Sequence, residues 1–121
     1  MPRFSYPKSL VFGFAIAAAS LCAAPSYANS SPQEGFNAAV NAACRYKKVY
    51  PGVSYDRVVA YIFGGLTPPA QSYIDNFAKA NRVDTVTAGS YMLGLVDWIK
   101  VQGDANKIYS TFINATKKRC G

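Results

Sequence analysis

The sequence predicts an all-α protein, a compact bundle of about five short helices closed by one disulfide bond. Apolar residues recur three or four positions apart, as they do along one face of a helix. No run alternates between apolar and polar residues in the way that the strands of a hairpin do. Half of the 121 residues are hydrophobic and 16% are charged, so the chain has one domain's length and can bury a core.

Residues 1–28 have the features of a secretory signal peptide, and residues 29–121 are expected to form the single helical domain. Two basic residues come first, and the apolar run from Leu10 to Ala24 that follows is short for a membrane span of ~20 residues. Small residues stand at the −3 and −1 positions of a cut after Ala28. We therefore expect export with cleavage after Ala28, and an uncleaved anchor is the alternative.

The mature domain keeps two of the chain's three cysteines, Cys44 and Cys120. An even pair of cysteines in an exported protein predicts one disulfide bond in an oxidising compartment. It would close a loop of roughly 76 residues and stabilise the fold by about 4 kcal/mol, because it restricts the unfolded chain.

The first helix is expected to begin at Ser31, which can cap it, with Pro32 in the first helical position and Glu34 completing a capping box. Pro51-Gly52 ends this segment. Apolar residues four positions apart share one of its faces: Phe36, Val40 and Cys44.

Ser54 can cap a second helix, and Gly64-Gly65 weakens its end. Thr67-Pro68 is expected to start a third helix, as its cap and its first-turn proline, and this helix ends near Asn81. The two helices carry apolar stripes made of Tyr55, Val58, Val59, Ile62, Phe63 and Leu66, and of Tyr73, Ile74 and Phe77.

Asp84 is the best cap for a fourth helix that runs toward Gln102 and stops at Gly103, and Asp104 caps a fifth. The stripe of the fourth helix holds Met92, Leu95, Val96 and Ile99, with Val86 and Leu93 beside it, and the fifth carries Ile108, Phe112 and Ile113.

The residue types exclude most kinds of catalytic site. The chain has no histidine, which excludes His-based triads, His metal sites and imidazole bases. No two of the six acidic residues stand three or four positions apart, so the spacing indicates neither a carboxylate dyad nor a cation site. Both mature cysteines are assigned to the disulfide. We expect a binding protein that is not an enzyme, has no cofactor or metal and, lacking any known motif, does not bind nucleic acid.

Two basic triplets lie next to the two mature cysteines. Cleavage leaves 11 basic and 6 acidic residues, a net charge of +5. Joining the cysteines would gather six cations into one patch, which would attract an acidic partner, an anionic lipid surface or a cell-wall polymer. The alternative is that each triplet favours a helix C-terminus and keeps the protein soluble. The six residues are Arg45, Lys47, Lys48, Lys117, Lys118 and Arg119.

Residues 60–70, AYIFGGLTPPA, and the Ile74-Asp75 pair that follows resemble the signature of the Tai-type amidase immunity proteins of type VI secretion systems. Residues 95–99, LVDWI, are similar to a second segment of that family. The family tends to carry its second cysteine where this chain has Leu95, and here the second mature cysteine is Cys120 instead.

The resemblance implies a dimeric periplasmic protein that binds a cognate cell-wall amidase and blocks its active site by steric occlusion. On this hypothesis the presented loop is the connection Gly64, Gly65, Leu66, Thr67 and Pro68, with glycines for close approach and Leu66 as an apolar anchor. The alternative is a buried helix junction with Leu66 in the core.

Two other functions share the signal peptide and the small helical domain. An acid-stress chaperone of the HdeA type also has one disulfide, but six acids and no histidine make a poor pH switch. A surface-binding or lipid-binding module would use the basic patch.

Overall fold

Five helices and their connections account for residues 30–121, the part of the chain that the computed structural model describes. They are α1 (Pro32–Val49), α2 (Tyr55–Gly64), α3 (Gln71–Asn81), α4 (Thr85–Gln102) and α5 (Ala105–Cys120). Within this range there is no strand, so the predicted all-α bundle is confirmed. The expected signal peptide, with its cut after Ala28, lies outside the described residues.

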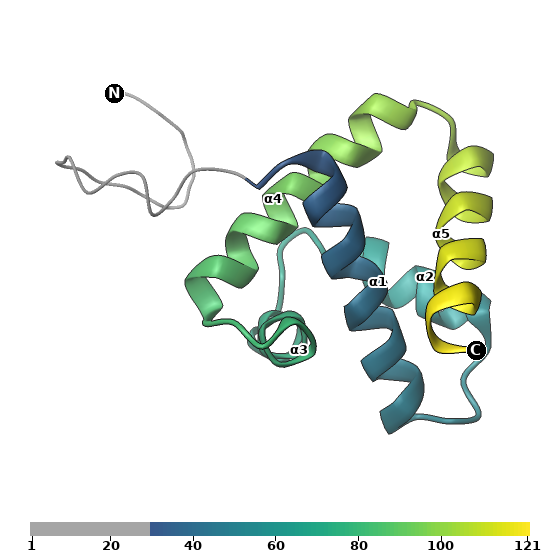
Figure 1. Cartoon of the computed structure of the whole chain (residues 1–121), viewed down its shortest axis with the longest axis horizontal. Coiled ribbons are helices and arrows are strands. Elements are labelled where there is room, and N and C mark those ends of the chain that lie inside the picture. The colour runs from purple at the N-terminus through teal and green to yellow at the C-terminus, as the bar shows by residue number, and fades with distance from the viewer. Residues whose placement is uncertain (1–29) are drawn as a thin grey trace, which may run out of the picture.

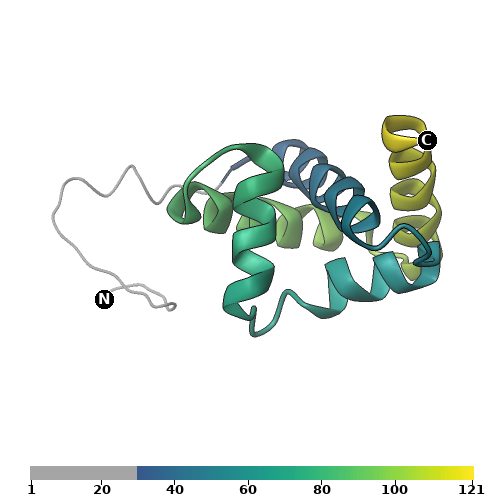
Figure 2. The same ribbon diagram turned by 90° about the horizontal axis from the view of Figure 1, so that it is seen from below.

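Helix α1 is the centre of the bundle and packs against each of the other four helices (Figures 1 and 2). Its sequence suits this place, because small side chains let neighbouring helices approach on several sides. The residues of α1 that are buried are Gly35, Phe36, Ala38, Ala39, Val40, Ala42 and Ala43.

Helices α1 and α4 touch backbone to backbone where they cross. A Cβ atom on Gly35 would lie 2.1 Å from the backbone nitrogen of Leu95, and one on Gly94 would lie 2.6 Å from the carbonyl oxygen of Ser31. Neither position has room for a methyl group. These two glycines therefore set the distance between the two longest helices.

Four of the helices begin at the residues that the sequence predicts. The Ser31 hydroxyl accepts from the Glu34 backbone N–H at 3.1 Å, and the Glu34 carboxylate accepts from the Ser31 N–H at 2.8 Å, which completes the capping box. The side chains of Ser54, Asp84 and Asp104 likewise accept backbone N–H groups in the first turns of α2, α4 and α5.

The predicted start of the third helix is wrong. Helix α3 begins at Gln71 with Ala70 in the cap position, and no side chain caps it. Thr67 and Pro68 belong to the preceding connection, and the bond between them is cis. The physical reason is the second proline, Pro69, whose ring disfavours a helical conformation at the residue before it.

The core lies between α1 and the inner faces of the other helices, and most of the predicted stripes are buried there. The ring centroids of Phe36 on α1 and Trp98 on α4 are 4.4 Å apart, which anchors the central crossing. Val86 and Leu93, expected beside the stripe of the fourth helix, are 45% and 47% exposed. They lie on the outer side of α4.

Thr116 on α5 is fully buried, and its hydroxyl oxygen has no hydrogen-bond partner among the described residues. A buried hydroxyl without a partner destabilises a fold, because it loses its bonds to water. We expect Thr116→Val, which keeps the shape, to raise the free energy of unfolding by about 1 kcal/mol. Urea denaturation measures this, and a less stable Val variant would show that the hydroxyl is bonded in the protein.

Candidate functional site

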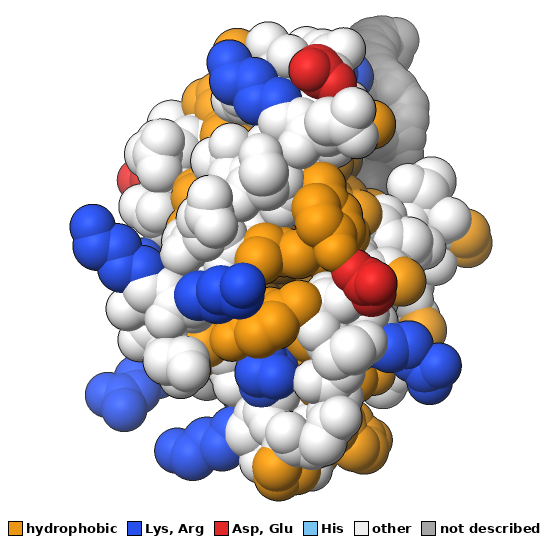
Figure 3. Space-filling model, turned by 90° about the vertical axis from the view of Figure 1, so that its right-hand side faces the viewer, with side chains coloured by type: hydrophobic (Ala, Val, Ile, Leu, Met, Phe, Trp, Pro, Cys, Tyr) orange, Lys and Arg blue, Asp and Glu red, His pale blue; other side chains and the backbone are white. Residues whose placement is uncertain are grey.

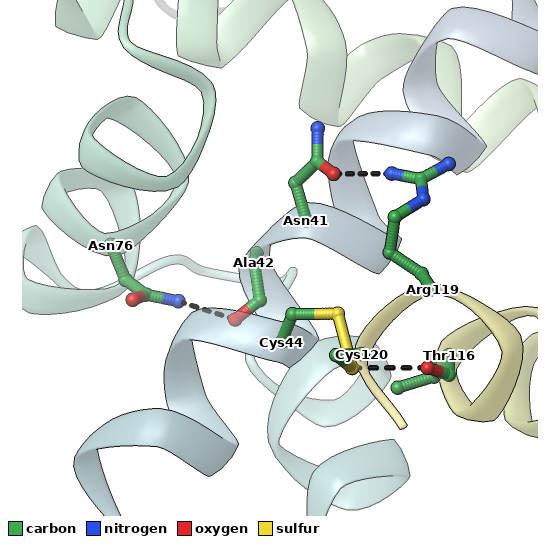
Figure 4. Close-up of a disulfide and its surroundings, with 7 residues drawn as sticks. All are labelled: Asn41, Ala42, Cys44, Asn76, Thr116, Arg119 and Cys120. Carbon is green, nitrogen blue, oxygen red and sulfur yellow. Dashed lines mark hydrogen bonds between the residues drawn. A yellow bond between two sulfur atoms is a disulfide. The ribbon is translucent and has the colours of Figure 1, made fainter.

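The disulfide joins Cys44, in the C-terminal half of α1, to Cys120, the last residue of α5, with their Cα atoms 5.6 Å apart. Figure 4 shows the bridge at the place where the end of α5 meets α1. The predicted pairing is confirmed. It brings the last turn of α5, with its cations, beside the α1 residues that follow Cys44.

A groove of about 1080 Å³ runs past this disulfide, and we call it the cationic groove. Residues of α1 line it together with the end of α3 and the end of α5. None of the described residues that line it is acidic. Its cations are Arg45, Lys47, Lys48, Lys79, Arg82 and Arg119.

Four of the six cations predicted to gather at the disulfide line the cationic groove, and two do not. The Lys47 ammonium donates to the carbonyl of Val53 at 3.0 Å and lies 4.4 Å from the centroid of the Tyr55 ring. Lys117 approaches the same ring, with its Nζ 5.3 Å from the centroid. Lys118 is exposed and is not part of the groove lining.

The face that α5 presents is rich in cations beyond the groove. Figure 3 shows Lys and Arg side chains spread over much of this face, around a strip of apolar side chains, with few acidic ones among them. The cations of this domain therefore extend beyond those that line the cationic groove.

Sequence reasoning missed two cations of the groove, Lys79 and Arg82. Both lie at the end of α3, and only the packing of α3 against α1 brings them beside the disulfide. The sequence holds one local sign of this arrangement: Arg82 stands directly after the third helix, at a position where glycine is usual. It adopts the left-handed conformation, with φ 56° and ψ 44°.

A chain of side-chain hydrogen bonds crosses three helices and holds Arg119 in place. Arg119 donates to the Asn41 side-chain oxygen, and the Asn41 amide donates to Asn81 at 2.8 Å (Figure 4 shows the first contact). The Asn81 amide in turn donates to the carbonyls of Phe77 and Ala38, at 2.9 and 3.2 Å. The Arg119 guanidinium can only donate hydrogen bonds and a carbonyl can only accept them. The orientations of the Asn41 and Asn81 side-chain amides are therefore determined.

A second groove, of about 350 Å³, opens on the other side of Arg45 and Lys79, and we call it the tyrosine groove. Its aromatic walls are Tyr46 and Tyr50 from the end of α1 and Tyr61 from α2. Because Arg45 and Lys79 line both grooves, the two grooves adjoin each other at these side chains. The remaining lining residues are Val49, Ser72, Asp75 and Asn76.

The aromatic rings of the tyrosine groove continue into the core. Tyr46 and Tyr61 stack with centroids 4.0 Å apart and an interplanar angle of 7°, and Tyr61 contacts the buried Tyr73 at 5.3 Å. Tyr50, at the outer end, is 56% exposed. A rigid aromatic stack therefore supports the exposed ring.

Tyr73 is buried and donates its hydroxyl to the carbonyl of Ile62. Burial raises the pKa of the Tyr73 phenol far above its usual value of 10, and the neighbouring Tyr61 raises it further. Burial also raises the pKa of Tyr61, with Tyr46 and Tyr50 adding to the effect. The raised pKa values thus favour the neutral form of the Tyr61 and Tyr73 phenols.

The raised pKa of Tyr73 predicts that the folded protein becomes less stable at alkaline pH. The unfolded chain releases the Tyr73 proton near pH 10, whereas the folded protein retains it, so the stabilisation is complete below pH 10 and is lost as the pH rises. We expect the free energy of unfolding to fall by about 1.4 kcal/mol per pH unit above that point from Tyr73. Urea titrations between pH 7 and about pH 11 measure the slope, and an equal slope in Tyr73→Phe would contradict this assignment.

The connection from Gly64 to Pro68 forms a helix junction. Leu66 is only 9% exposed and belongs to the core, so it cannot serve as the apolar anchor that the loop hypothesis requires. A Cβ on Gly65 would lie 2.6 Å from the Tyr73 ring, so this glycine is needed for packing inside the protein. The exposed residues of the connection are Gly64, Thr67 and Pro68.

Comparisons with protein-family models, with curated proteins and with solved structures find no match for this chain. Among residues 30–121, no group of three or more His, Cys, Asp or Glu side chains is arranged to hold a metal ion. None of the helices in the same range is long and apolar enough to cross a membrane.

Proposed function

We propose that the protein is a periplasmic immunity protein, which binds a cognate cell-wall amidase and blocks its active site without any chemistry of its own. The observation that carries this proposal is that the tyrosine groove adjoins the cationic groove, with Arg45 and Lys79 lining both. Tyrosine and arginine are the residues that most often dominate the binding energy of protein interfaces. The kind of partner follows from the resemblance of residues 60–70 and 95–99 to the Tai-type immunity proteins.

Blocking an active site requires a surface that already has its binding conformation, because ordering it on binding would weaken the complex. Two features support this. The disulfide fixes the end of α5 against α1. The hydrogen bonds from Arg119 through Asn41 to Asn81 hold the ends of α5 and α3 on opposite sides of α1. The walls of the cationic groove are thus held before any partner arrives.

The test is a calorimetric titration of the mature domain, residues 29–121, with the amidase encoded by the neighbouring reading frame. We expect a stoichiometric complex with a dissociation constant well below about 1 μM. Absence of a complex when both proteins are at micromolar concentration would refute the proposal, and so would a neighbouring frame that encodes no cell-wall hydrolase.

An acid-activated chaperone of the HdeA type has less support. Such activation needs carboxyl groups whose protonation loosens the fold. None of the six acidic side chains in the described domain is buried. Hydrogen bonds from the backbone N–H and the side chain of Thr87 lower the pKa of Asp84, so protonation of Asp84 would weaken the cap of α4, but this carboxyl is exposed and lies at one helix end. Protection of a client protein at about pH 2–3 would restore this alternative.

A surface-binding module is the alternative that the cationic groove itself favours. Cosedimentation with phosphatidylglycerol vesicles or with peptidoglycan tests it, and such binding should weaken steeply as salt is added. Salt-dependent cosedimentation without amidase binding would establish this function in place of the immunity role.

Dimerisation is part of the proposal, because it follows from the same resemblance. Helix α4 carries exposed apolar side chains on its outer side: Val86, Leu93 and Val101. Light scattering after size-exclusion chromatography measures the mass of the mature protein, and a monomer at all micromolar concentrations would contradict this part alone.

A further inference from the structure

We infer that the two adjoining grooves, and not the connection from Gly64 to Pro68, are the surface that docks the partner. The occupant is an acidic segment of the partner protein that also places one apolar or aromatic side chain against the tyrosines. The inference rests on the proposed function for the identity of the partner, but the docking surface can be tested without it.

Charge complementarity identifies the acidic part of the occupant. The cationic groove has six cations and no acidic side chain among its described lining residues. The adjoining tyrosine groove contributes Asp75, whose carboxylate accepts a hydrogen bond from Gln71 at 2.9 Å. A negatively charged segment would find several donors and little repulsion along the whole path.

The backbone at Arg82 supports the same conclusion independently. Arg82 is the only residue other than glycine with a positive φ in the described chain, at a helix end where glycine would be unstrained. Its side chain lines the cationic groove. The backbone is therefore strained at Arg82, and an additional guanidinium lines the cationic groove at the same position.

Arg119, on the opposite wall, is held in position before binding. Its contact with Asn41, and the contact of Asn41 with Asn81, limit the conformations of a side chain that would otherwise be mobile. A cation that is already oriented loses less entropy when it binds a carboxylate. Asn41 is thus a positioning residue for Arg119.

The tyrosines distinguish a protein segment from a lipid surface or a charged polymer. A polyanion needs cations alone, whereas the tyrosine groove offers Tyr46, Tyr50 and Tyr61 directly beside Arg45 and Lys79. Aromatic walls next to guanidinium and ammonium groups suit a polypeptide that presents acidic and apolar side chains together. Both kinds of contact lie side by side, because the two grooves share Arg45 and Lys79.

The first experiment uses a probe that does not depend on the amidase. The ¹⁵N-labelled mature domain is titrated at low salt with a peptide of six glutamates and one tryptophan. We expect amide shifts centred on residues 45–50 and 79–82, and loss of at least 10-fold in affinity for Arg45→Glu and Lys79→Glu. Lys100→Glu is the matched control, because it makes the same charge change on an exposed lysine of α4 outside both grooves. An equal loss in the control, or shifts elsewhere, would overturn the inference.

Arg82 gives a second readout in which stability and binding change in opposite directions. Arg82→Gly removes the backbone strain, so the urea midpoint should rise while affinity for the peptide falls about 3-fold or more. Arg82→Lys keeps the charge and should bind within about 2-fold of the wild type. If Arg82→Gly binds as well as the wild-type protein, Arg82 has no role in docking and this part of the inference is wrong.

Binding measurements with the amidase and with phosphatidylglycerol vesicles distinguish a failure of this inference from a failure of the proposed function. If the amidase binds and the Arg45→Glu and Lys79→Glu variants bind it equally well, the function stands and the docking surface is overturned. If the peptide binds in the grooves and no amidase binds, the surface stands and the function fails. If phosphatidylglycerol vesicles bind in a way that depends on Arg45 and Lys79 and the peptide does not, the occupant is a lipid surface.

Discussion

Removal of the disulfide is expected to lower the free energy of unfolding by about 4 kcal/mol, the largest effect we expect from changing a single interaction. The bond links residues 76 positions apart, so breaking it restores a large number of conformations to the unfolded chain. A loss of this size is a large part of the total stability of a domain this small. Urea unfolding of the protein with Cys44→Ala and Cys120→Ala measures it.

Two comparisons control this measurement. The wild-type protein unfolded under reducing conditions should match the double variant, and the reductant should leave the double variant unchanged. The variant should also lose affinity for the glutamate peptide, because the end of α5 carries Arg119 into the cationic groove. A change of less than about 1 kcal/mol would show that packing alone holds α5 against α1.

Addition of one methyl group at Gly35 is expected to destabilise the domain by ~3 kcal/mol. The new Cβ would lie within 2.7 Å of backbone atoms of α4 at Leu95, Gly94 and Tyr91. Backbone cannot move aside as a flexible side chain can, so α1 and α4 must separate along their whole contact. The measurement is urea denaturation of Gly35→Ala.

Gly89→Ala is the matched control, because it makes the same change within helix α4. A Cβ on Gly89 meets nothing within 4 Å, and alanine is the better helix former by about 0.5–1 kcal/mol. We therefore expect the control to be slightly stabilising. Equal effects of the two substitutions would contradict the close approach of the two helices at Gly35.

The sequence predicts the helices well where a signal is local. Ser31, Ser54, Asp84 and Asp104 each cap a helix, because a cap depends on a side chain and the N–H groups two or three residues further on. The start of α3 was predicted wrongly, since Thr67-Pro68 has the same local pattern and the constraint comes from the following Pro69.

The candidate site was predicted only in part, because it depends on packing between helices. The disulfide follows from cysteine number and export, and it correctly places Arg119 beside Arg45. Lys79 and Arg82 enter the groove only through the contact of α3 with α1, which no local pattern contains. Leu66 is a case in which the local sequence, Gly65-Leu66-Thr67, is compatible with both a surface anchor and a buried helix junction, and packing places the side chain in the core.

The most direct test of the central claim, that this bundle blocks a partner through its surface, is an inhibition titration. Hydrolysis of purified peptidoglycan by the amidase from the neighbouring reading frame is followed while the mature protein is added. We predict that activity falls in proportion to the added protein and reaches zero near an equimolar ratio. Full hydrolysis in the presence of excess protein, at concentrations where a complex has been measured, would contradict the claim.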